Sequence, residues 1–355
     1  MSARLRGLGV LVVLLAVVGC LVACCPEDET FAGDVYIAGS CSDGTWLVPV
    51  YWLNDARTAL SRLSTNGDGE ASGAFVRGSD VYFAGYTADT SGVSVPCVWK
   101  NGARTDLSVL VSGKAGEGYS IHVDDAGVVY VCGYTTNATD VKIACFWRAG
   151  LRTDLPGIDA AQDSSAWGIV AIGSTTYCAG YSDDSSSRQK AVYWSNSTLH
   201  ELPMPDGTMY GAANRVVADG THILITGSDA GACYWRDGVR IGLTDVIDET
   251  MSSHANHLAV DQETYYVIGY SENADEVSIP CIWTDGVRED LEVIDESMGG
   301  NAHRIGVAEG DIYVTGRVDT LAGVEVPCYW LNGERHDLSV MDPDMNGAAD
   351  GIAFR

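Results

Sequence analysis

The 355-residue chain contains little lysine and none of the common signatures of nucleotide-binding or hydrolytic enzymes. Lysine occurs at four positions, and 21 basic side chains stand against 48 acidic ones, which gives a formal net charge of −27. Such a charge repels the phosphate backbone, so we expect no nucleic-acid partner. A nucleophile elbow, a metalloprotease helix, a P-loop and a dinucleotide-binding fingerprint are all absent. Sequence motifs therefore identify no catalytic residue.

Long apolar runs are also missing, except at the N-terminus. Arg4 and Arg6 precede an apolar stretch of about a dozen residues that begins at Gly7, which is too short for a transmembrane helix and typical of a signal-peptide core. We therefore expect an exported protein. No later stretch is long enough to hold the chain in a membrane.

The end of this segment reads Leu21-Val22-Ala23-Cys24 and resembles the bacterial lipobox. The resemblance implies a lipoprotein signal peptide over residues 1–23, lipidation of Cys24, and a tether over residues 24–30. Cys20 is a second candidate for the lipidated residue, and an ordinary secretory signal cut near Ala23 is the alternative. The residue after Cys24 is Cys25 and not the Asp that favours inner-membrane retention, so an anchor in the outer membrane or at the cell surface is expected.

One sequence motif recurs seven times in the rest of the chain. It consists of a Gly that closes a short apolar run, a Trp that follows it, and a Leu eight residues after the Trp. Successive glycines are 42 to 48 residues apart. This period, built from short strand-like runs, predicts an all-β fold, a seven-bladed β-propeller of four-stranded antiparallel blades over residues 31–355. The glycines are Gly39, Gly85, Gly133, Gly180, Gly227, Gly269 and Gly316; the tryptophans are Trp52, Trp99, Trp147, Trp194, Trp235, Trp283 and Trp330.

The order of the pieces predicts how the ring closes. The first strand-like run, residues 34–39, matches the second strand of a unit, whereas residues 349–355 match the first strand. One blade should therefore combine N-terminal and C-terminal strands, which leaves no open sheet edge. We expect a single domain and a monomer.

The repeated motif also resembles that of the HAF-type extracellular repeat proteins, His-Ala-Phe-x-Trp-x-x-Gly-x-x-x-Asp-Leu. Residues 96–107 read Pro-Cys-Val-Trp-Lys-Asn-Gly-Ala-Arg-Thr-Asp-Leu, and the leading His-Ala-Phe is replaced by Pro-Cys here and by Pro-Cys or Ala-Cys in other units. The resemblance implies a propeller in a bacterial exported protein, and it supplies no reaction and no catalytic residue.

Five of the eleven cysteines follow the repeat. They lie two residues before the Trp of their unit, where the other two units have Val50 and Val192. This exchange indicates a small buried apolar site and not a disulfide, although a local bridge between Cys132 and Cys145 is an alternative. The five are Cys97, Cys145, Cys233, Cys281 and Cys328.

Residues 342–350 fit a calcium-loop pattern, Asp-x-Asp-x-Asn-Gly-x-x-Asp. Oxygen ligands at alternate positions suit a hard cation. Asp342, Asp344, Asn346 and Asp350 are therefore candidate calcium ligands, with a solvated loop as the alternative. We expect no other cofactor.

The longer connections, from the second to the third strand and from blade to blade, should emerge on one face of the ring. Polar and aromatic residues follow the blade-to-blade connections and should cluster around the axis of that face. They favour a small anionic or polar ligand such as a sugar acid, whereas a structural lining of a wet channel is the alternative reading. The candidate binding residues are Tyr119, Trp167, Asn214, Arg215, His254, His257, His303 and Arg304.

These observations together favour a lipid-anchored, non-catalytic ligand-binding or scaffold propeller at the bacterial cell envelope. Its partner would be a polysaccharide, a small anionic ligand or an envelope protein. The alternative is a carbohydrate-active enzyme, a lyase or hydrolase, with its site at the axial mouth. A His beside a carboxylate in one axial pocket would favour the enzyme, whereas polar groups spread around the rim would favour binding.

Overall fold

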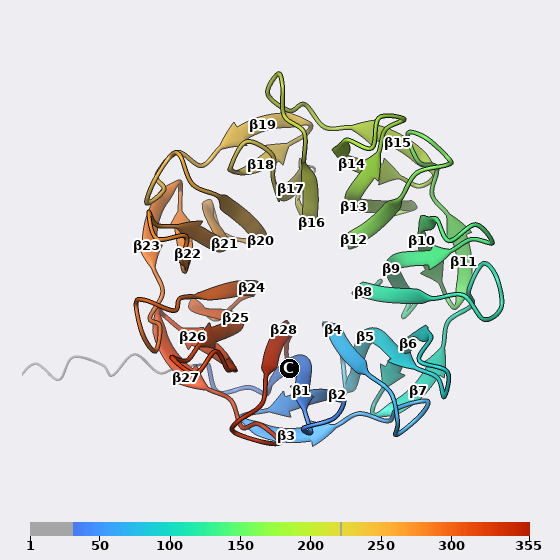
Figure 1. Cartoon of the computed structure of the whole chain (residues 1–355), viewed down its shortest axis with the longest axis horizontal. Helices are drawn as coiled ribbons and strands as arrows, with labels where there is room; N and C mark the ends of the chain where they lie inside the picture. The colour runs from blue at the N-terminus through green and yellow to red at the C-terminus, as the bar shows by residue number, and fades with distance from the viewer. Residues whose placement is uncertain (1–30, 221) are drawn as a thin grey trace, which may run out of the picture. The chain divides into compact units, whose positions relative to one another are not determined.

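Seven four-stranded antiparallel sheets surround a central axis in the computed structural model, which describes residues 31–220 and 222–355 (Figure 1). The chain divides into the units Met1–Ala32 and Gly33–Arg355, and every strand belongs to the second. The predicted signal peptide and tether, with Cys20 and Cys24, lie outside the described residues. Within residues 31–220 and 222–355 no helix is long and apolar enough to span a bilayer.

The predicted seven-bladed propeller is confirmed, and each blade runs from an inner strand at the axis to an outer strand at the rim. Blade 1 consists of β28 (Gly347–Phe354), β1 (Val35–Ser42), β2 (Leu47–Leu53) and β3 (Ala56–Ala59). Blade 2 consists of β4 (Gly69–Arg77), β5 (Asp80–Ala88), β6 (Ser94–Lys100) and β7 (Ala103–Asp106). Blade 3 consists of β8 (Gly116–Val123), β9 (Val129–Thr136), β10 (Lys142–Arg148) and β11 (Leu151–Asp154).

The remaining blades repeat this order. Blade 4 consists of β12 (Ser164–Ile172), β13 (Thr175–Asp183), β14 (Gln189–Ser195) and β15 (Thr198–Glu201). Blade 5 consists of β16 (Ala212–Asp219), β17 (His222–Ser228), β18 (Ala232–Arg236) and β19 (Val239–Gly242). Blade 6 consists of β20 (Ser253–Asp261), β21 (Thr264–Glu272), β22 (Ser278–Thr284) and β23 (Val287–Asp290), and blade 7 of β24 (Gly300–Ala308), β25 (Asp311–Asp319), β26 (Glu325–Leu331) and β27 (Glu334–Asp337).

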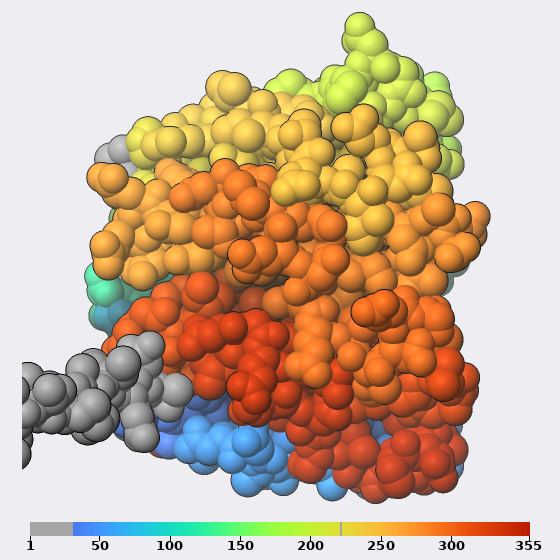
Figure 2. Space-filling model, turned by 90° about the vertical axis from the view of Figure 1, so that its left-hand side faces the viewer, coloured from blue at the N-terminus to red at the C-terminus, as the bar shows by residue number. Residues whose placement is uncertain are grey.

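Blade 1 closes the ring with strands from both ends of the propeller, as the sequence predicts. The C-terminal strand β28 pairs with β1 from Val35↔Phe354 to Cys41↔Gly347. Backbone hydrogen bonds of 2.8 and 2.9 Å join Asp34 and Arg355 in both directions at the seam. In the side view of Figure 2 the red C-terminal segments lie directly against the blue N-terminal ones.

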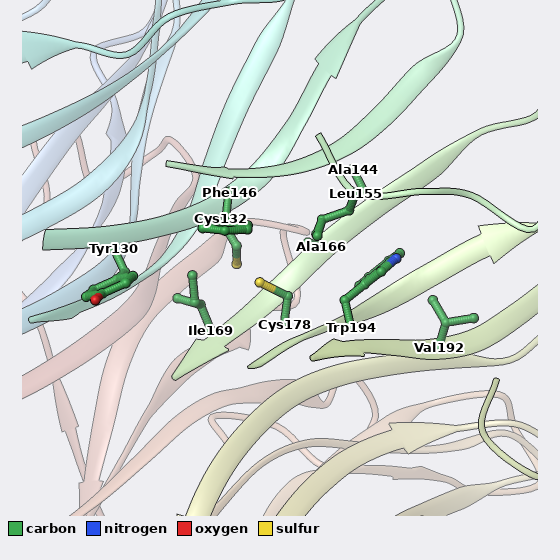
Figure 3. Packing of buried hydrophobic residues seen from close by; sticks show 10 residues of the cluster. All are labelled: Tyr130, Cys132, Ala144, Phe146, Leu155, Ala166, Ile169, Cys178, Val192 and Trp194. Atoms are coloured by element: carbon green, nitrogen blue, oxygen red, sulfur yellow. The ribbon is translucent and has the colours of Figure 1, made fainter. Parts of the chain in front are cut away.

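The repeated Trp ties each blade to the one before it. All seven indole rings are buried, and each Nε1 donates to a backbone carbonyl in the connection that precedes its own blade, for example Trp99 to Ser61 at 2.8 Å. Trp52 makes the same bond to Ser339 across the seam. The apolar core lies in seven layers between neighbouring blades, of which Figure 3 shows the layer between blades 3 and 4. A buried N–H costs free energy when it is unpaired, so these bonds stabilise the indoles in the core.

The cysteines serve as buried apolar residues in these layers. Within the described part of the chain all eight cysteines are free thiols, so the alternative Cys132–Cys145 bridge is wrong. In Figure 3 the sulfur atoms of Cys132 and Cys178 point toward each other between blades 3 and 4. Burial raises the pKa of both thiols, which keeps them in the unreactive protonated form.

The repeated Gly has a specific steric cause. Each inner strand carries a β-bulge opposite this glycine, at which one inner-strand residue has no partner in the second strand. The bulge pushes a carbonyl group inward, so that a Cβ atom at Gly85 would lie 1.8 Å from the carbonyl oxygen of Glu70. The other six repeat glycines face the equivalent carbonyl at 1.8 to 2.0 Å. Only glycine fits at this position.

Blade 5 departs from the repeat. Gly227 and Trp235 are eight residues apart, whereas the corresponding pairs in the other blades are 13 or 14 apart. The β17–β18 connection is only Asp229–Gly231, while the five other blades from 2 to 7 use five-residue loops. The outer-strand Asp that pairs with Arg in blades 2, 3, 6 and 7 is Gly242 here. Arg240 instead binds the fully buried carboxylate of Asp229 in the short turn, at 2.6 Å from Nε.

Candidate functional site: the axial pocket

The bulges create a ring of seven side chains around the axis. Each bulge residue is displaced from the regular pleat, and one comes from each blade. All seven line a cavity of about 420 Å³ at the end of the ring where the inner strands begin, called the axial pocket below. A bulge typically redirects a side chain in this way. The seven residues are Ser72, Tyr119, Trp167, Asn214, Asn256, His303 and Asp350.

Blades 1 to 3 make one side of the pocket acidic. Glu70 and Asp350 line it directly, and Glu117 follows as the residue equivalent to Glu70 on blade 3. Burial, and next the charge of Asp350, raise the pKa of Glu70 to about 7, against the opposing effect of a 2.8 Å hydrogen bond from Ser72 Oγ. Like charges that cannot separate destabilise each other, so one carboxyl group holds a proton near neutral pH.

A histidine contacts one of these carboxylates. The imidazole Nδ1 of His303 lies 2.7 Å from Oδ1 of Asp350, and both side chains are largely shielded from solvent. The ring N–H is not aligned for a regular hydrogen bond to that oxygen. A histidine thus lies beside a carboxylate in the same pocket as Glu70, which is the geometry that favours acid–base chemistry.

The asparagines of blades 5 to 7 form a belt of amides along the opposite side. The Nδ2 of Asn214 donates to the carbonyl of Ala255 at 2.9 Å, and the Nδ2 of Asn256 donates to the Oδ1 of Asn301 and to the carbonyl of Ala302, each at 2.8 Å. These bonds connect three neighbouring inner strands. With a further contact of 3.4 Å from Asn214 Nδ2 to Asn256 Oδ1, these bonds use both donor hydrogens of Asn214 and of Asn256.

The two arginines of the prediction form the base of the pocket. Arg304 donates to the carbonyls of Ser72 at 3.1 Å and His303 at 3.2 Å, and Arg215 donates to those of Trp167 and Asn214. Both side chains also line the cavity on the other side of the ring. Desolvation lowers the pKa of Arg304 to about 10 despite the neighbouring Asp350. Because these guanidinium groups satisfy bulge carbonyls, their arrangement fits a supporting role more closely than capture of an anion.

The two remaining predicted histidines lie outside the axial pocket. His257 lines the opposite axial cavity, of about 360 Å³, where its Nδ1 accepts a 3.3 Å hydrogen bond from the Ile305 amide. Burial lowers the pKa of His257 to about 4, so the ring is neutral at physiological pH. His254 stacks on Tyr270, with ring centroids 4.9 Å apart, in an adjoining groove of about 650 Å³.

The aromatic side chains of the ring lie toward its acidic half. The hydroxyl of Tyr119 donates to Oε2 of Glu117 at 2.8 Å, and its ring is 6.1 Å from that of Tyr134. Trp167 packs against Tyr181 with a centroid distance of 5.1 Å. Aromatic faces beside carboxylates provide an environment that favours a cationic or neutral polar group.

The predicted calcium ligands do not converge. Oδ1 of Asp342 accepts the Asp344 amide at 3.0 Å, Oδ1 of Asn346 accepts the Glu325 amide at 3.1 Å, and Asp350 lies in the axial pocket beside His303. Among the residues that the structure describes, no group of three or more His, Cys, Asp or Glu side chains is arranged to hold a metal ion. Calcium binding stays a prediction.

Six of the eight predicted binding residues thus meet in the axial pocket, and His254 and His257 line neighbouring cavities. Five other lining residues of the pocket were not among the eight: Glu70, Ser72, Asn256, Asn301 and Asp350, the last of which was predicted as a calcium ligand. Ser72 occupies the repeat position of Tyr119, and Glu117 that of Glu70, so their place in the repeat was the available signal. No protein-family profile and no curated protein matches the sequence.

Proposed function

We propose that this propeller is a binding protein that holds a polar ligand with an amine group in the axial pocket. The ring of seven bulge residues carries the proposal, because it brings one side chain from every blade to a single cavity of ligand size. The fold supports binding or scaffold roles in general. The axial pocket supports ligand binding at the end of the ring where the inner strands begin.

The charge of the pocket favours an amine over an acid. Glu70 and Asp350 line one side, the charge of Glu117 on the neighbouring blade acts on Glu70, and the two arginines donate to backbone carbonyls. The whole chain is strongly acidic as well, which disfavours anions at any distance. An ammonium group would relieve the repulsion between these carboxylates and replace the proton that Glu70 holds. The anionic ligand expected from the sequence is therefore less well matched than an amino sugar.

The test compares glucosamine, glucose and glucuronate by calorimetry at pH 7.5 with the full-length protein. We expect glucosamine to bind and glucuronate not to bind. Asp350→Asn should weaken glucosamine binding about tenfold or more, because Asp350 lines the pocket and a charge-assisted hydrogen bond is lost. Glu70→Gln should weaken it likewise. Binding of glucuronate alone would contradict the proposed charge preference.

Glu70→Gln also distinguishes a ligand-binding role of Glu70 from a purely structural one. A carboxyl group whose folded-state pKa is raised contributes stability that is complete below its unfolded value of about 4.5 and is lost as the pH rises through 7. The variant should therefore melt at a higher temperature than the parent at pH 8 and at nearly the same temperature at pH 5. Loss of binding together with a gain in stability is typical of a functional residue. A destabilised variant at pH 8 would indicate a structural role for Glu70.

An acid–base enzyme at the same pocket is the second candidate, and the His303–Asp350 contact favours it. A protonated Glu70 near neutral pH can donate a proton to a leaving oxygen, and His303 can accept one. Amino-sugar oligomers incubated with the protein should then yield new reducing ends or unsaturated sugars. His303→Asn should abolish that turnover while binding persists. Binding without turnover would leave the binding protein as the function.

The proposed location is the bacterial cell envelope, through a lipid on Cys24. The signal-like segment before Cys24 supports this part of the proposal. Cys24→Ser should move the protein from the membrane fraction to the soluble exported fraction, since one acylated residue would provide the anchor. Cys20→Ser is the matched control and should leave the protein in the membrane fraction. Release by Cys20→Ser instead would assign the anchor to Cys20.

A further inference from the structure

A second cavity beside the axial pocket is a consequence of the short repeat. It measures about 650 Å³ and runs between blades 5 and 6. Its wall includes the whole β17–β18 turn and Ser228 before it, at the place where the other blades carry a longer loop. The shorter turn therefore opens the rim of the ring at this one blade. We call this cavity the blade-5 groove.

The blade-5 groove is continuous with the axial pocket. Trp167, Asn214, Asn256 and Asn301 line both cavities. A ligand in the axial pocket can therefore extend outward over the short β17–β18 turn, between the β15–β16 connection and the β19–β20 connection. The site has the form of a pocket with an open channel, which suits a chain and not only a single small molecule.

The walls of the groove are held in fixed positions. On the blade-5 side, the Gly211 amide donates to the carbonyl of Gln189 at 3.0 Å, which docks the β15–β16 connection on blade 4. On the blade-6 side, the Thr250 amide donates to Asp248 at 2.8 Å and the Ala232 amide donates to Ser253 Oγ at 2.9 Å. The groove thus lies between anchored segments.

The chemistry of the lining suits a hydroxyl-rich ligand that carries no negative charge. Among the described residues neither Lys nor Arg lines the groove; Asp229 is neutralised by Arg240, and Glu249 adds one carboxylate to the lining. Serine, threonine and glutamine side chains supply hydrogen bonds, while Tyr210, which is 67% exposed, and the stacked His254–Tyr270 pair supply flat apolar faces. The β15–β16 connection that carries Tyr210 is the yellow-green projection at the top of Figures 1 and 2.

We infer that the blade-5 groove binds the chain of a linear oligosaccharide whose amino-sugar residue occupies the axial pocket. This inference rests on the proposed function, since it extends the same site. Hydroxyl groups would bond to the polar lining, and the apolar faces of the sugar rings would cover Tyr210 and Tyr270. The short turn of blade 5 thereby allows the site to accept an oligosaccharide longer than one sugar residue.

The experiment measures binding of glucosamine and of its β-1,4-linked tetramer to the full-length protein. We expect the tetramer to bind at least tenfold more tightly than the monomer. Tyr210→Ser and Ser252→Trp should each remove most of that gain, the first by deleting an apolar face and the second by filling the groove, while monomer affinity stays unchanged. Leu321→Ser is the matched control, since Leu321 is 73% exposed in the β25–β26 loop of blade 7, outside the groove, and should change neither affinity.

Each contrary outcome rejects a different part of the inference. Equal affinity for monomer and tetramer would overturn the groove and leave the axial pocket standing. Binding of neither ligand would reject both the groove and the proposed function. Tight binding of an oligogalacturonate or of an extended peptide in place of the amino-sugar tetramer would reject the ligand class. Unchanged tetramer affinity in both groove variants would place the chain elsewhere.

Discussion

Deletion of Gly351–Arg355 should lower the melting temperature by roughly 10 °C or more, because it opens the ring at its seam. These residues form the second half of β28 and pair with β1 from Val35↔Phe354 to Ala38↔Gly351. Their loss leaves the backbone groups of β1 unpaired on its inner edge, beside the axis. Thermal unfolding followed by circular dichroism measures the effect.

Two controls isolate the strand from its last side chain. Arg355→Ala removes an exposed ion pair with Asp34 and a cation–π contact with Tyr36, and should change the melting temperature little compared with loss of the strand. A synthetic peptide of residues 347–355 should restore part of the stability of the truncated chain by adding the missing strand in trans. A truncated protein that melts like the parent would show that β28 does not contribute to closure.

The fold was predictable because its determinants repeat. Seven occurrences of one motif average out local ambiguity, and the tight hairpins at Asn101-Gly102 and its equivalents follow from residues that accept positive φ angles. The order of strand types at the two ends also determined the composition of blade 1. Such information is local in the sequence, so the sequence alone could reveal it.

The site was only partly predictable, because a bulge shifts the register without an obvious residue signature. A regular strand would point alternate residues toward the axis, and the extra residue changes which ones do so. His303 and Arg304 are adjacent, yet one lies beside Asp350 in the pocket and the other forms its base. His257, at the repeat position of Arg304, falls into the opposite cavity for the same reason.

The charge preference depends on distances that the sequence does not give. Arg215 and Arg304 indicated an anion site when considered as free cations. In the structure both guanidinium groups donate to carbonyls of the bulges, so they are engaged by the backbone. The acidic side chains of blades 1 to 3 therefore determine the charge of the pocket. Likewise, the 42-residue spacing between Gly227 and Gly269 was visible in the sequence, but the groove that it opens was not.

Substitution of one repeat glycine should destabilise the protein and remove the site together. In Gly85→Ala the new Cβ would lie 1.8 Å from the carbonyl oxygen of Glu70, so the bulge of β4 has to move or disappear. We expect a loss of about 3 kcal/mol or more in the free energy of unfolding, at the upper end for overpacking, because the obstacle is backbone and not a flexible side chain. Chemical denaturation measures this change.

The bulge of β4 also directs Ser72 and positions Glu70, so amine binding at the axial pocket should be lost in Gly85→Ala even at temperatures where the protein stays folded. Gly92→Ala is the matched control, since Gly92 has a positive φ of 79° in an open turn of the same blade and a Cβ there meets no atom within 4 Å. That change should cost about 1 kcal/mol and leave binding intact. If Gly85→Ala is no less stable than Gly92→Ala, the bulge is not the reason for the repeated glycine, and the link between the repeat and the axial ring is refuted.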